Sequence, residues 1–327
     1  MNPQEMSAGR REMLLRLLRL GGVTGAAAGL GVWLRYRSRH PQEPIAVATR
    51  PDFTVPPDPG RPEMAVIQGD NPGLLVRRAI EELGGIRRFI ASRDVVVIKP
   101  NVAWDRTPEQ AANTNPQVVA EVCRLCREAG ARRVIVTDVT INEPRRCFAR
   151  SGIGEAARTA GAEIILPGAE LFREVDLHGE VLSSWPVLEP FLVADKMINL
   201  PIAKHHSLTG ASLGLKNWYG ILGGARHRLH QRIHESLVDL AAFMRPTLTL
   251  IDAYRVLLRN GPGGGNLQDV LLKKTLIAGT DPVALDAYVA QAYWNLDWRT
   301  LRYLKLATDR HLGNMNFEQV RTRFTAL

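Results

Sequence analysis

The sequence predicts an α/β fold with a mostly parallel central sheet, helices on both faces and a ligand crevice at the carboxyl ends of the strands. Three observations support this prediction. From about residue 62, short β-branched runs alternate with amphipathic segments. Several of those segments open with Asn-Pro or Asp-Pro, a typical helix start. Chemically specific side chains also follow several of the apolar runs, where ligands bind in open parallel sheets.

The predicted strands are short, apolar and rich in β-branched residues, which is typical of strands buried on both faces. They are VVVI (95–98), RVIVT (133–137), EIIL (163–166), MINL (197–200), TLTLI (247–251) and TLIA (275–278).

The predicted helices lie between these runs and carry apolar residues with helical spacing. They span residues 72–85, 115–130, 152–162, 230–244 and 281–294. Asn71-Pro72, Asn115-Pro116 and Asp281-Pro282 mark three of the starts.

Polar residues cluster immediately after the predicted strands. Lys99 and Asn101 follow the first run, Asp138 and Thr140 the second, and Asp252 the fifth. The segment 201–206 follows the fourth run, and Asp281 the sixth. Because parallel strands end at one edge of their sheet, these residues are expected to share a crevice.

The composition indicates a folded domain and gives little support to nucleic-acid binding. The chain has 327 residues, 45% of them hydrophobic, and a net charge of +9. Eight basic residues but only three acidic ones lie in the first 50 positions, so most of the excess charge precedes the α/β pattern. A nucleic-acid-binding domain usually carries its basic excess on the folded part.

The N-terminal segment predicts export. Arg10-Arg11 precedes an apolar, Gly/Ala-rich stretch over residues 20–34, which resembles a twin-arginine signal read by the twin-arginine translocon. Residues 1–50 are therefore expected to be an export signal or a membrane anchor with a linker. The protein would be periplasmic, or membrane-anchored and facing the periplasm. Residues 51–327 are expected to form one α/β domain, with a division into two lobes left open.

Three cysteines cannot supply a four-cysteine cluster, so an iron–sulfur cluster within this chain is not expected. Cys123 and Cys126 form a C-x-x-C pair inside the predicted helix 115–130. Their spacing places them among its apolar positions, which favours core packing over a redox or metal role.

The stretch KHHSLTGASLGLKNWYG (204–220) is the strongest candidate for a ligand site. A helix start is expected at Thr209-Gly210, where free backbone amides would favour an anion. Lys204 and Lys216 would add positive charge, and His205 would transfer protons. Asn217 adds a polar group beside them.

A second cluster, ARHRLHQRIHESL (225–237), places His227, His230 and His234 at i, i+3 and i+7 of a helix. Three interpretations stay open: contacts to an anionic substrate, a divalent transition-metal site, and ordinary histidines at a helix edge. Arg226 and two other interleaved arginines disfavour a bare metal ion. His230 is a second candidate for proton transfer.

The remaining motifs disfavour NTP binding, dinucleotide binding and a hydrolase of the G-x-S-x-G type. The turn NGPGGGN (260–266) lacks the G-K-[ST] ending of a P-loop, and we interpret it as a mobile loop or lid. No GxGxxG follows a strand, and no G-x-S-x-G elbow is present. Asp281 is a candidate catalytic carboxylate, but its position before Pro282 favours a helix cap.

The blocks VVVIKPN, MINLPIAKHHSLTGASLGLKNWYG, TLTLIDA, NGPGGG and GTDPVALDAY resemble the family called domain of unknown function 362, over roughly residues 62–292. No activity or catalytic residue comes with this resemblance. The α/β pattern with His and Lys at a crevice is also loosely similar to that of nickel-dependent lactate racemases. The motif residues that the first resemblance implies as a site are Lys99, Asn101, Lys204, His205, Thr209, Lys216, Asn217, Asp252 and Asp281.

These observations together predict an exported α/β protein whose enzyme-like crevice binds a small carboxylate or phosphate ligand. His205, His230 and Lys216 would be catalytic; Lys99, Asn101, Lys204, Thr209, Asn217, Arg226, Asp252 and Asp281 would hold substrate. The alternative is a non-catalytic periplasmic protein that binds a ligand or a metallocofactor.

Overall fold

The computed structural model describes residues 52–327, and all of them belong to one compact unit. The predicted export signal or anchor at residues 1–50 lies outside the described residues. Within residues 52–327, no helix combines the length and the apolar character needed to cross a membrane.

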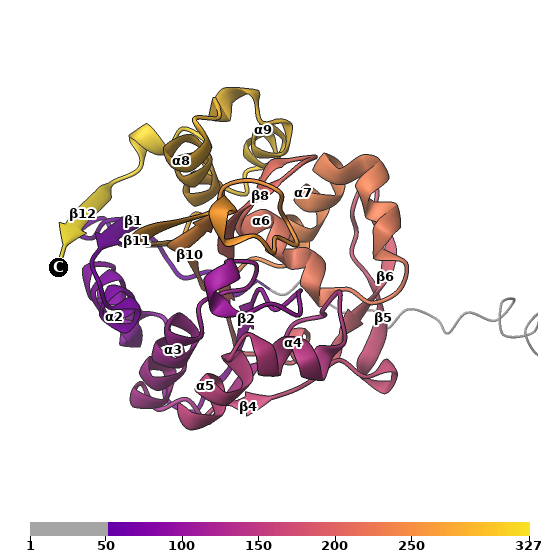
Figure 1. Ribbon diagram of the computed structural model, residues 1–327, viewed down its shortest axis with the longest axis horizontal. Helices are drawn as coiled ribbons and strands as arrows, with labels where there is room; N and C mark the ends of the chain where they lie inside the picture. Colours follow the sequence, from indigo (N-terminus) through magenta and orange to yellow (C-terminus); the bar gives the residue numbers. More distant parts are fainter. Residues whose placement is uncertain (1–51) are drawn as a thin grey trace, which may run out of the picture. The chain divides into compact units, whose positions relative to one another are not determined.

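A mixed ten-stranded sheet forms the centre of this unit (Figure 1). Its strands are β1 (Met64–Gln68), β2 (Val95–Pro100), β3 (Arg133–Val136), β4 (Glu163–Ile164), β7 (Lys196–Leu200), β8 (Ile202–His206), β9 (Gly210–Ser212), β10 (Leu248–Leu257), β11 (Val270–Gly279) and β12 (Thr322–Ala326). The antiparallel pair β5 (Phe172–Asp176) and β6 (Ser184–Leu188) forms a separate small sheet.

The main path of the large sheet is β12-β1-β11-β10-β7-β2-β3-β4, and β8 pairs with both β10 and β9. Strands β10, β7, β2, β3 and β4 are parallel, whereas β11 is antiparallel to β10 and to β1. The predicted mostly parallel sheet is therefore confirmed.

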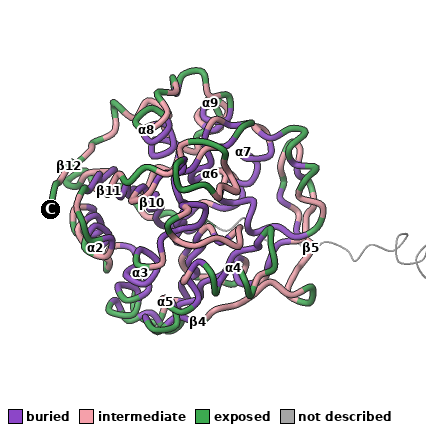
Figure 2. Tube along the Cα trace, in the orientation of Figure 1, coloured by how far each residue is buried: buried purple, intermediate pink, exposed green. Residues whose placement is uncertain are grey.

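Helices cover both faces of the sheet, as expected. They are α2 (Pro72–Glu82), α3 (Pro116–Glu128), α4 (Pro144–Arg150), α5 (Ile153–Thr159), α6 (Gly214–Asn217), α7 (Ile233–Phe243), α8 (Pro282–Trp294) and α9 (Arg302–Asp309). On β2, Val96 and Ile98 pack with α2 and α3, while Val95 and Val97 pack with α7. This alternation follows from the two-residue period of a strand. Buried residues consequently line the central strands and the inward helix faces (Figure 2).

The three Asx-Pro helix starts are confirmed. The side chains of Asn71, Asn115 and Asp281 each accept backbone N–H hydrogen bonds from the first turn of α2, α3 and α8. Proline follows each cap at the first position of the helix. A backbone N–H there would have no hydrogen-bond partner within the helix, so its absence in proline costs nothing.

Several elements differ from the prediction. The segment 163–166 contributes only the two-residue strand β4, and α5 is preceded by the separate helix α4. Strands β1, β5, β6, β8, β9 and β12 were not predicted. β12 lies at the sheet edge, and its Phe324 is exposed. This strand therefore lacks the buried apolar run by which a strand is recognised in a sequence.

The C-x-x-C pair lies in the core of the domain. Cys123 and Cys126 are fully buried on α3, and neither forms a disulfide. Burial raises the pKa of the Cys123 thiol to about 12 and raises that of Cys126 well above its usual value. Both thiols are therefore protonated and inert at neutral pH.

Replacing Cys123 and Cys126 by alanine should leave metal content and any visible absorbance unchanged. Each truncation should lower the free energy of unfolding by no more than ~1–2 kcal/mol, because only a small buried group is lost. Urea denaturation and elemental analysis measure the two effects. Loss of iron or of a chromophore in the double variant would contradict core packing and favour a redox role.

Candidate functional site

Lys99 lies near the carboxyl end of β2 and is the first residue of the candidate site along the chain. It continues the alternation of Val95 and Val97, so its side chain enters the face covered by α6 and α7. Its side chain is fully buried, and its Nζ lies 2.7 Å from Oδ1 of Asp138, the second residue after β3. The second carboxylate oxygen of Asp138 accepts the backbone N–H of Val102 at 2.7 Å.

Gly220 makes this ion pair possible. A Cβ atom at position 220 would lie 1.9 Å from Oδ1 of Asp138 and 2.6 Å from Nζ of Lys99. The Gly220 carbonyl also accepts the N–H of Val139 at 2.8 Å. The last residue of the KNWYG block is therefore a glycine because its backbone contacts the buried ion pair.

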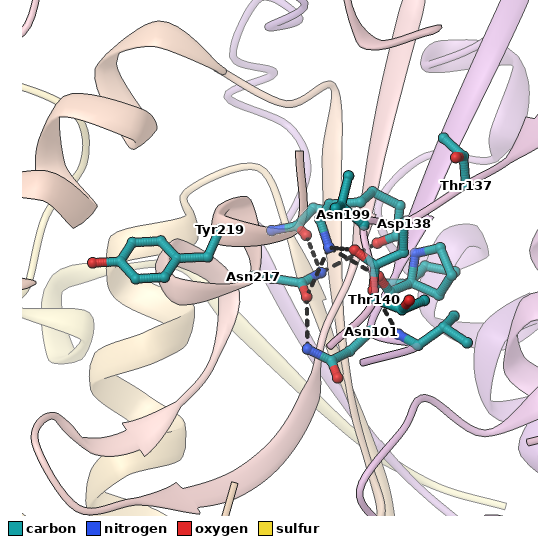
Figure 3. Close-up of polar contacts among 12 residues, drawn as sticks. Asn101, Thr137, Asp138, Thr140, Asn199, Asn217 and Tyr219 are labelled. Atoms are coloured by element: carbon teal, nitrogen blue, oxygen red, sulfur yellow. Dashed lines mark hydrogen bonds and ion pairs between the residues drawn. The ribbon is translucent and has the colours of Figure 1, made fainter. Parts of the chain in front are cut away.

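Asn217 on α6 connects the ion pair to the neighbouring strands (Figure 3). Its Oδ1 accepts from Nζ of Lys99 at 3.1 Å and from Nδ2 of Asn101 at 3.0 Å. Its Nδ2 donates to the Lys99 carbonyl and to Oδ1 of Asn199 on β7. All hydrogen-bonding atoms of this amide are used within the protein, so we infer that Asn217 positions the site.

Lys204 and His206 enter the site from β8. They are two residues apart on the strand and share one face, both buried. Nζ of Lys204 donates to Oδ1 of Asn101 at 2.9 Å and to the Ala112 carbonyl at 2.7 Å. Nδ1 of His206 contacts the N–H of Leu208 and Oγ1 of Thr209. Thr209 thus supports the imidazole and the turn between β8 and β9.

A cavity of about 290 Å³ opens at this end of the sheet. It lies between the ends of β2 and β3, the β8–β9 hairpin, α6 and the 3₁₀ segments η5 (Trp218–Ile221) and η6 (Arg226–Arg232). Its lining residues are Lys99, Asn101, Ala103, Trp104, Asp138, Val139, Ile141, Lys204, His206, Ser212, Lys216, Asn217, Tyr219, Gly220, Arg226, His227, His230 and Pro262.

Four cationic side chains of the described residues line this cavity. They differ in how many of their N–H donors are hydrogen-bonded within the protein. An ammonium has three N–H donors and a guanidinium five. Lys99 has three acceptors, Pro100 O among them, and Lys204 has two. Arg226 donates to the carbonyls of Val139, Tyr219 and Thr140.

Lys216 is the exception among these cations. Within residues 52–327 its Nζ has no hydrogen bond or ion pair, and it lies 4.4 Å from the ring centroid of Tyr219. The donors of Lys216, and the remaining donors of Arg226 and Lys204, are the ones left for a ligand.

Burial, together with the crowded positive charge, lowers the pKa values of basic groups that line the cavity. Burial, reinforced by the Lys216 ammonium, lowers the pKa of Lys204 to about 7. Burial, reinforced by Arg226, lowers that of Lys216 to about 8. Burial and nearby cations lower the pKa of His206 to about 3, so this imidazole is neutral. Burial also lowers the pKa of Lys99, and the Asp138 carboxylate opposes that change.

The structure brings most of the predicted site residues together. Lys99, Asn101, Lys204, Lys216, Asn217, Arg226, His227 and His230 all line the cavity. The close network of Asn101, Asp138, Asn199 and Asn217 is visible in Figure 3.

Asp252 and Asp281 do not line the cavity and are corrected to structural roles. The Asp252 carboxylate accepts the N–H groups of Asn115 and Tyr254 and so fixes the start of α3. Asp281 caps α8 and accepts the N–H of Asn314. Both carboxylates bond to backbone amides instead of facing a ligand.

The predicted helix start at Thr209-Gly210 is also wrong. Residues 210–212 form β9, and α6 begins only at Gly214. The amides of Gly214 and Leu215 donate to the two carboxylate oxygens of Asp286 at 2.7 and 3.1 Å. An internal carboxylate therefore takes the place expected for a bound anion.

The predicted roles of two histidines need correction. His205 does not line the cavity, because adjacent strand residues point to opposite faces; His206 lines it instead. His234 stacks on Tyr303, with ring centroids 6.4 Å apart, whereas His230 contacts His206 and Tyr219.

The three helix-spaced histidines do not form the predicted metal site. Arg232, with φ −131°, separates η6 from α7, so His227, His230 and His234 do not share one helical face. In the part of the chain that the structure describes, no three His, Cys, Asp or Glu side chains are arranged to hold a metal ion.

The glycine-rich turn 260–266 forms part of the cavity wall. Pro262 lines the cavity, and the Gly263 and Gly265 carbonyls accept from Arg106 Nε at 3.2 Å and Gln110 Nε2 at 2.9 Å. The predicted mobile loop is thus tied to the segment that follows β2.

A wider depression of about 740 Å³ lies over α2, α3 and α5. Its charged side chains pair with one another, since Arg77 and Arg124 both contact Glu121. We place the candidate site in the smaller cavity because only there do unpaired donors converge.

Sequence reasoning placed Asp138 and the segment 201–206 at the crevice but gave no site role to Asp138, His206 or Tyr219. Asp138 was recognisable as a strand-end residue, because it follows the apolar run 133–137 directly. His206 required knowing that residues 202–206 are a strand. Tyr219 gave no separate signal.

The fold and site define a mixed α/β protein with a cation-lined cavity at the strand ends. Residues 96–291 match the family described as Domain of unknown function (DUF362). This segment is more than half of the chain, and the chain belongs to that family.

One curated relative is a thylakoid-associated protein of Synechocystis sp., 28% identical over 247 residues, which are 73% of this chain and 74% of the relative. Among solved structures, the lactate racemase apoprotein from Thermoanaerobacterium thermosaccharolyticum is 13% identical, with a TM-score of 0.39 over 70% of this chain. A Thermotoga maritima protein is also 13% identical, with a TM-score of 0.36 over 74% of this chain. The matches span only 55% and 60% of those two structures.

Proposed function

We propose that the cavity binds a small anion through a carboxylate or phosphate group, in an enzyme-like site. The observation that carries this proposal is the Lys216 ammonium, which lines the cavity without a hydrogen bond or ion pair to any described residue. Arg226 and Lys204 line the same space with donors to spare.

The electrostatics of the cavity support an anionic ligand. Burying several cations together is costly unless negative charge compensates them. Among residues 52–327, Asp138 is the one carboxylate that lines the cavity, and it is already paired with Lys99. Burial is the main cause of the lowered pKa values of Lys204 and Lys216, and repulsion from neighbouring cations adds to it. An anion would relieve that repulsion.

The lining residues divide naturally into roles. Lys216, Arg226 and the remaining N–H of Lys204 would hold the anion. Lys99, Asn101 and Asn217 would position these groups through their internal network. The exposed His230, at the cavity rim, would exchange protons with solvent.

Affinity for an anion should fall as pH rises. The protonated lysine binds the anion, so binding takes up a proton wherever Lys216 is already partly neutral. With pKa values of about 8 for Lys216 and about 7 for Lys204, affinity should drop at least about tenfold between pH 7 and pH 9, because loss of the Lys216 proton alone accounts for that factor.

Calorimetric titration with sulfate and oxalate measures this effect, since neither anion changes its own charge over that range. The matched control is Lys305→Met, which removes an exposed lysine on α9. Affinity that stays constant from pH 7 to pH 9, or the absence of any binding at pH 7, would refute the proposal.

We also propose that the protein is exported through the twin-arginine translocon and acts in the periplasm or at its membrane surface. Arg10-Arg11 and the apolar stretch 20–34 support this proposal. In fractionated cells, the wild type should reach the envelope and Arg10→Lys/Arg11→Lys should stay in the cytoplasm. An identical distribution of both would overturn it, and resistance to carbonate washing would select the anchored form.

A further inference from the structure

We propose that Lys216 is a nucleophile that forms an imine with the carbonyl carbon of a small oxo acid bound in the cavity. This inference rests on the proposed anion-binding function and narrows its substrate class to anions that also carry a ketone or aldehyde group.

The geometry selects Lys216 among the three lysines of the cavity. Lys99 has an acceptor for each of its three N–H donors, and Lys204 has two acceptors. Lys216 has none within residues 52–327, and its Nζ packs against the Tyr219 ring. Imine formation removes every N–H of the attacking amine. Among the three lysines of the cavity, only Lys216 can lose them without breaking a hydrogen bond to a described residue.

The surroundings also favour the neutral amine that this chemistry needs. No carboxylate of residues 52–327 contacts Lys216, and the lower pKa of about 8 leaves part of the population unprotonated at neutral pH. A lysine desolvated beside other cations is a recognised form of activated nucleophile.

The neighbouring cations supply a place for the acid group of the substrate. Arg226 is fixed by three backbone carbonyls and keeps two of its five N–H donors. A bidentate contact to a carboxylate needs two such donors. Ala103, Val139 and Ile141 add apolar wall to a cavity of about 290 Å³, which suits a short carbon skeleton.

The proposed step balances without any oxidant or reductant. The Lys216 nitrogen bonds to the carbonyl carbon, and the carbonyl oxygen takes up a proton to give a carbinolamine. The carbon–oxygen bond then breaks, and both amine hydrogens leave with the oxygen as water. His230 at the rim is placed to relay these protons.

Reductive trapping tests this inference. The full-length protein is incubated with pyruvate and sodium borohydride, and the intact mass and tryptic peptides are then measured. One equivalent of reduced adduct is expected on the peptide that contains Lys216, and trapping should increase from pH 6 to pH 8 as the amine is deprotonated. Excess oxalate should protect the site.

Two variants complete the experiment. Lys216→Arg keeps the positive charge and should form no adduct. Lys305→Met should form the same amount of adduct as the wild type. Circular dichroism verifies that Lys216→Arg is folded, and peptide mapping of the wild type locates the adduct independently of any variant.

The outcomes separate the two proposals. If oxalate and sulfate bind but no adduct forms on Lys216, imine formation is refuted and anion binding stands. If neither anion binds, the proposed function itself fails. An adduct spread over surface lysines, or one retained in Lys216→Arg, would also refute a specific role for Lys216.

Discussion

Replacing Asp138 by alanine should lower the free energy of unfolding by about 3–5 kcal/mol, the cost of leaving a buried charge unpaired. In the described part of the chain, Asp138 is the one carboxylate in contact with the fully buried Lys99, at 2.7 Å. Its removal also deprives the Val102 N–H of its acceptor. Urea denaturation followed by circular dichroism measures the effect.

The double variant Lys99→Met/Asp138→Ala is the control for this prediction. It should recover part of the lost stability, because the uncompensated ammonium is gone while the Val102 N–H remains without its acceptor. Gly220→Ala should destabilise independently, because its Cβ would meet both members of the pair. A loss below about 1 kcal/mol in Asp138→Ala, as for an exposed ion pair, would contradict the buried network.

Replacing Lys216 by methionine should weaken sulfate and oxalate binding about tenfold to a hundredfold. A hydrogen bond to a charged group contributes roughly 1.5–3 kcal/mol. Of the described lysines that line the cavity, Lys216 alone has three free donors. Thermal stability should stay the same or increase, since the substitution removes an unpaired, partly buried charge. Calorimetric titration and a thermal melt measure the two effects, with Lys305→Met as the surface control.

The pH dependence of stability gives this variant a second readout. The pKa of Lys216 is lowered from 10.5 in the unfolded chain to about 8 in the fold. The unfolded state therefore binds more protons between these values, and wild-type stability should rise with pH across that window. The stability of Lys216→Met should rise less steeply with pH. If Lys216→Met left both the pH dependence of stability and the anion affinity unchanged, Lys216 would not be part of the site.

The parallel core of the fold could be predicted because each of its elements carries a strong local signal. Buried strands such as residues 95–98 are uninterrupted β-branched runs, and Asn71, Asn115 and Asp281 combine a capping side chain with a following proline. The edge strands were missed for the opposite reason. β12 exposes Phe324, so its pairing with β1 is visible only in the folded sheet.

The candidate site was predicted in part, and its errors have a common physical cause. A sequence shows which side chains are polar but not which partners they will find. Asp252, Asp281 and Asp286 bond to backbone amides at helix starts, a use that looks the same in sequence as a catalytic carboxylate. His206 lines the cavity and His205 does not, because adjacent residues of β8 point to opposite faces of the strand. The sequence alone does not show which of the two faces the cavity.

The measurement closest to the central claim is crystallographic location of a bound anion. Crystals of the wild type soaked in selenate should show an anomalous peak inside the cavity, within hydrogen-bond distance of Lys216 Nζ and the Arg226 guanidinium. Crystals of Lys216→Met soaked in the same way should lack that peak. A cavity that holds no selenium in the wild type, while the anion occupies other surfaces of the protein, would contradict the account.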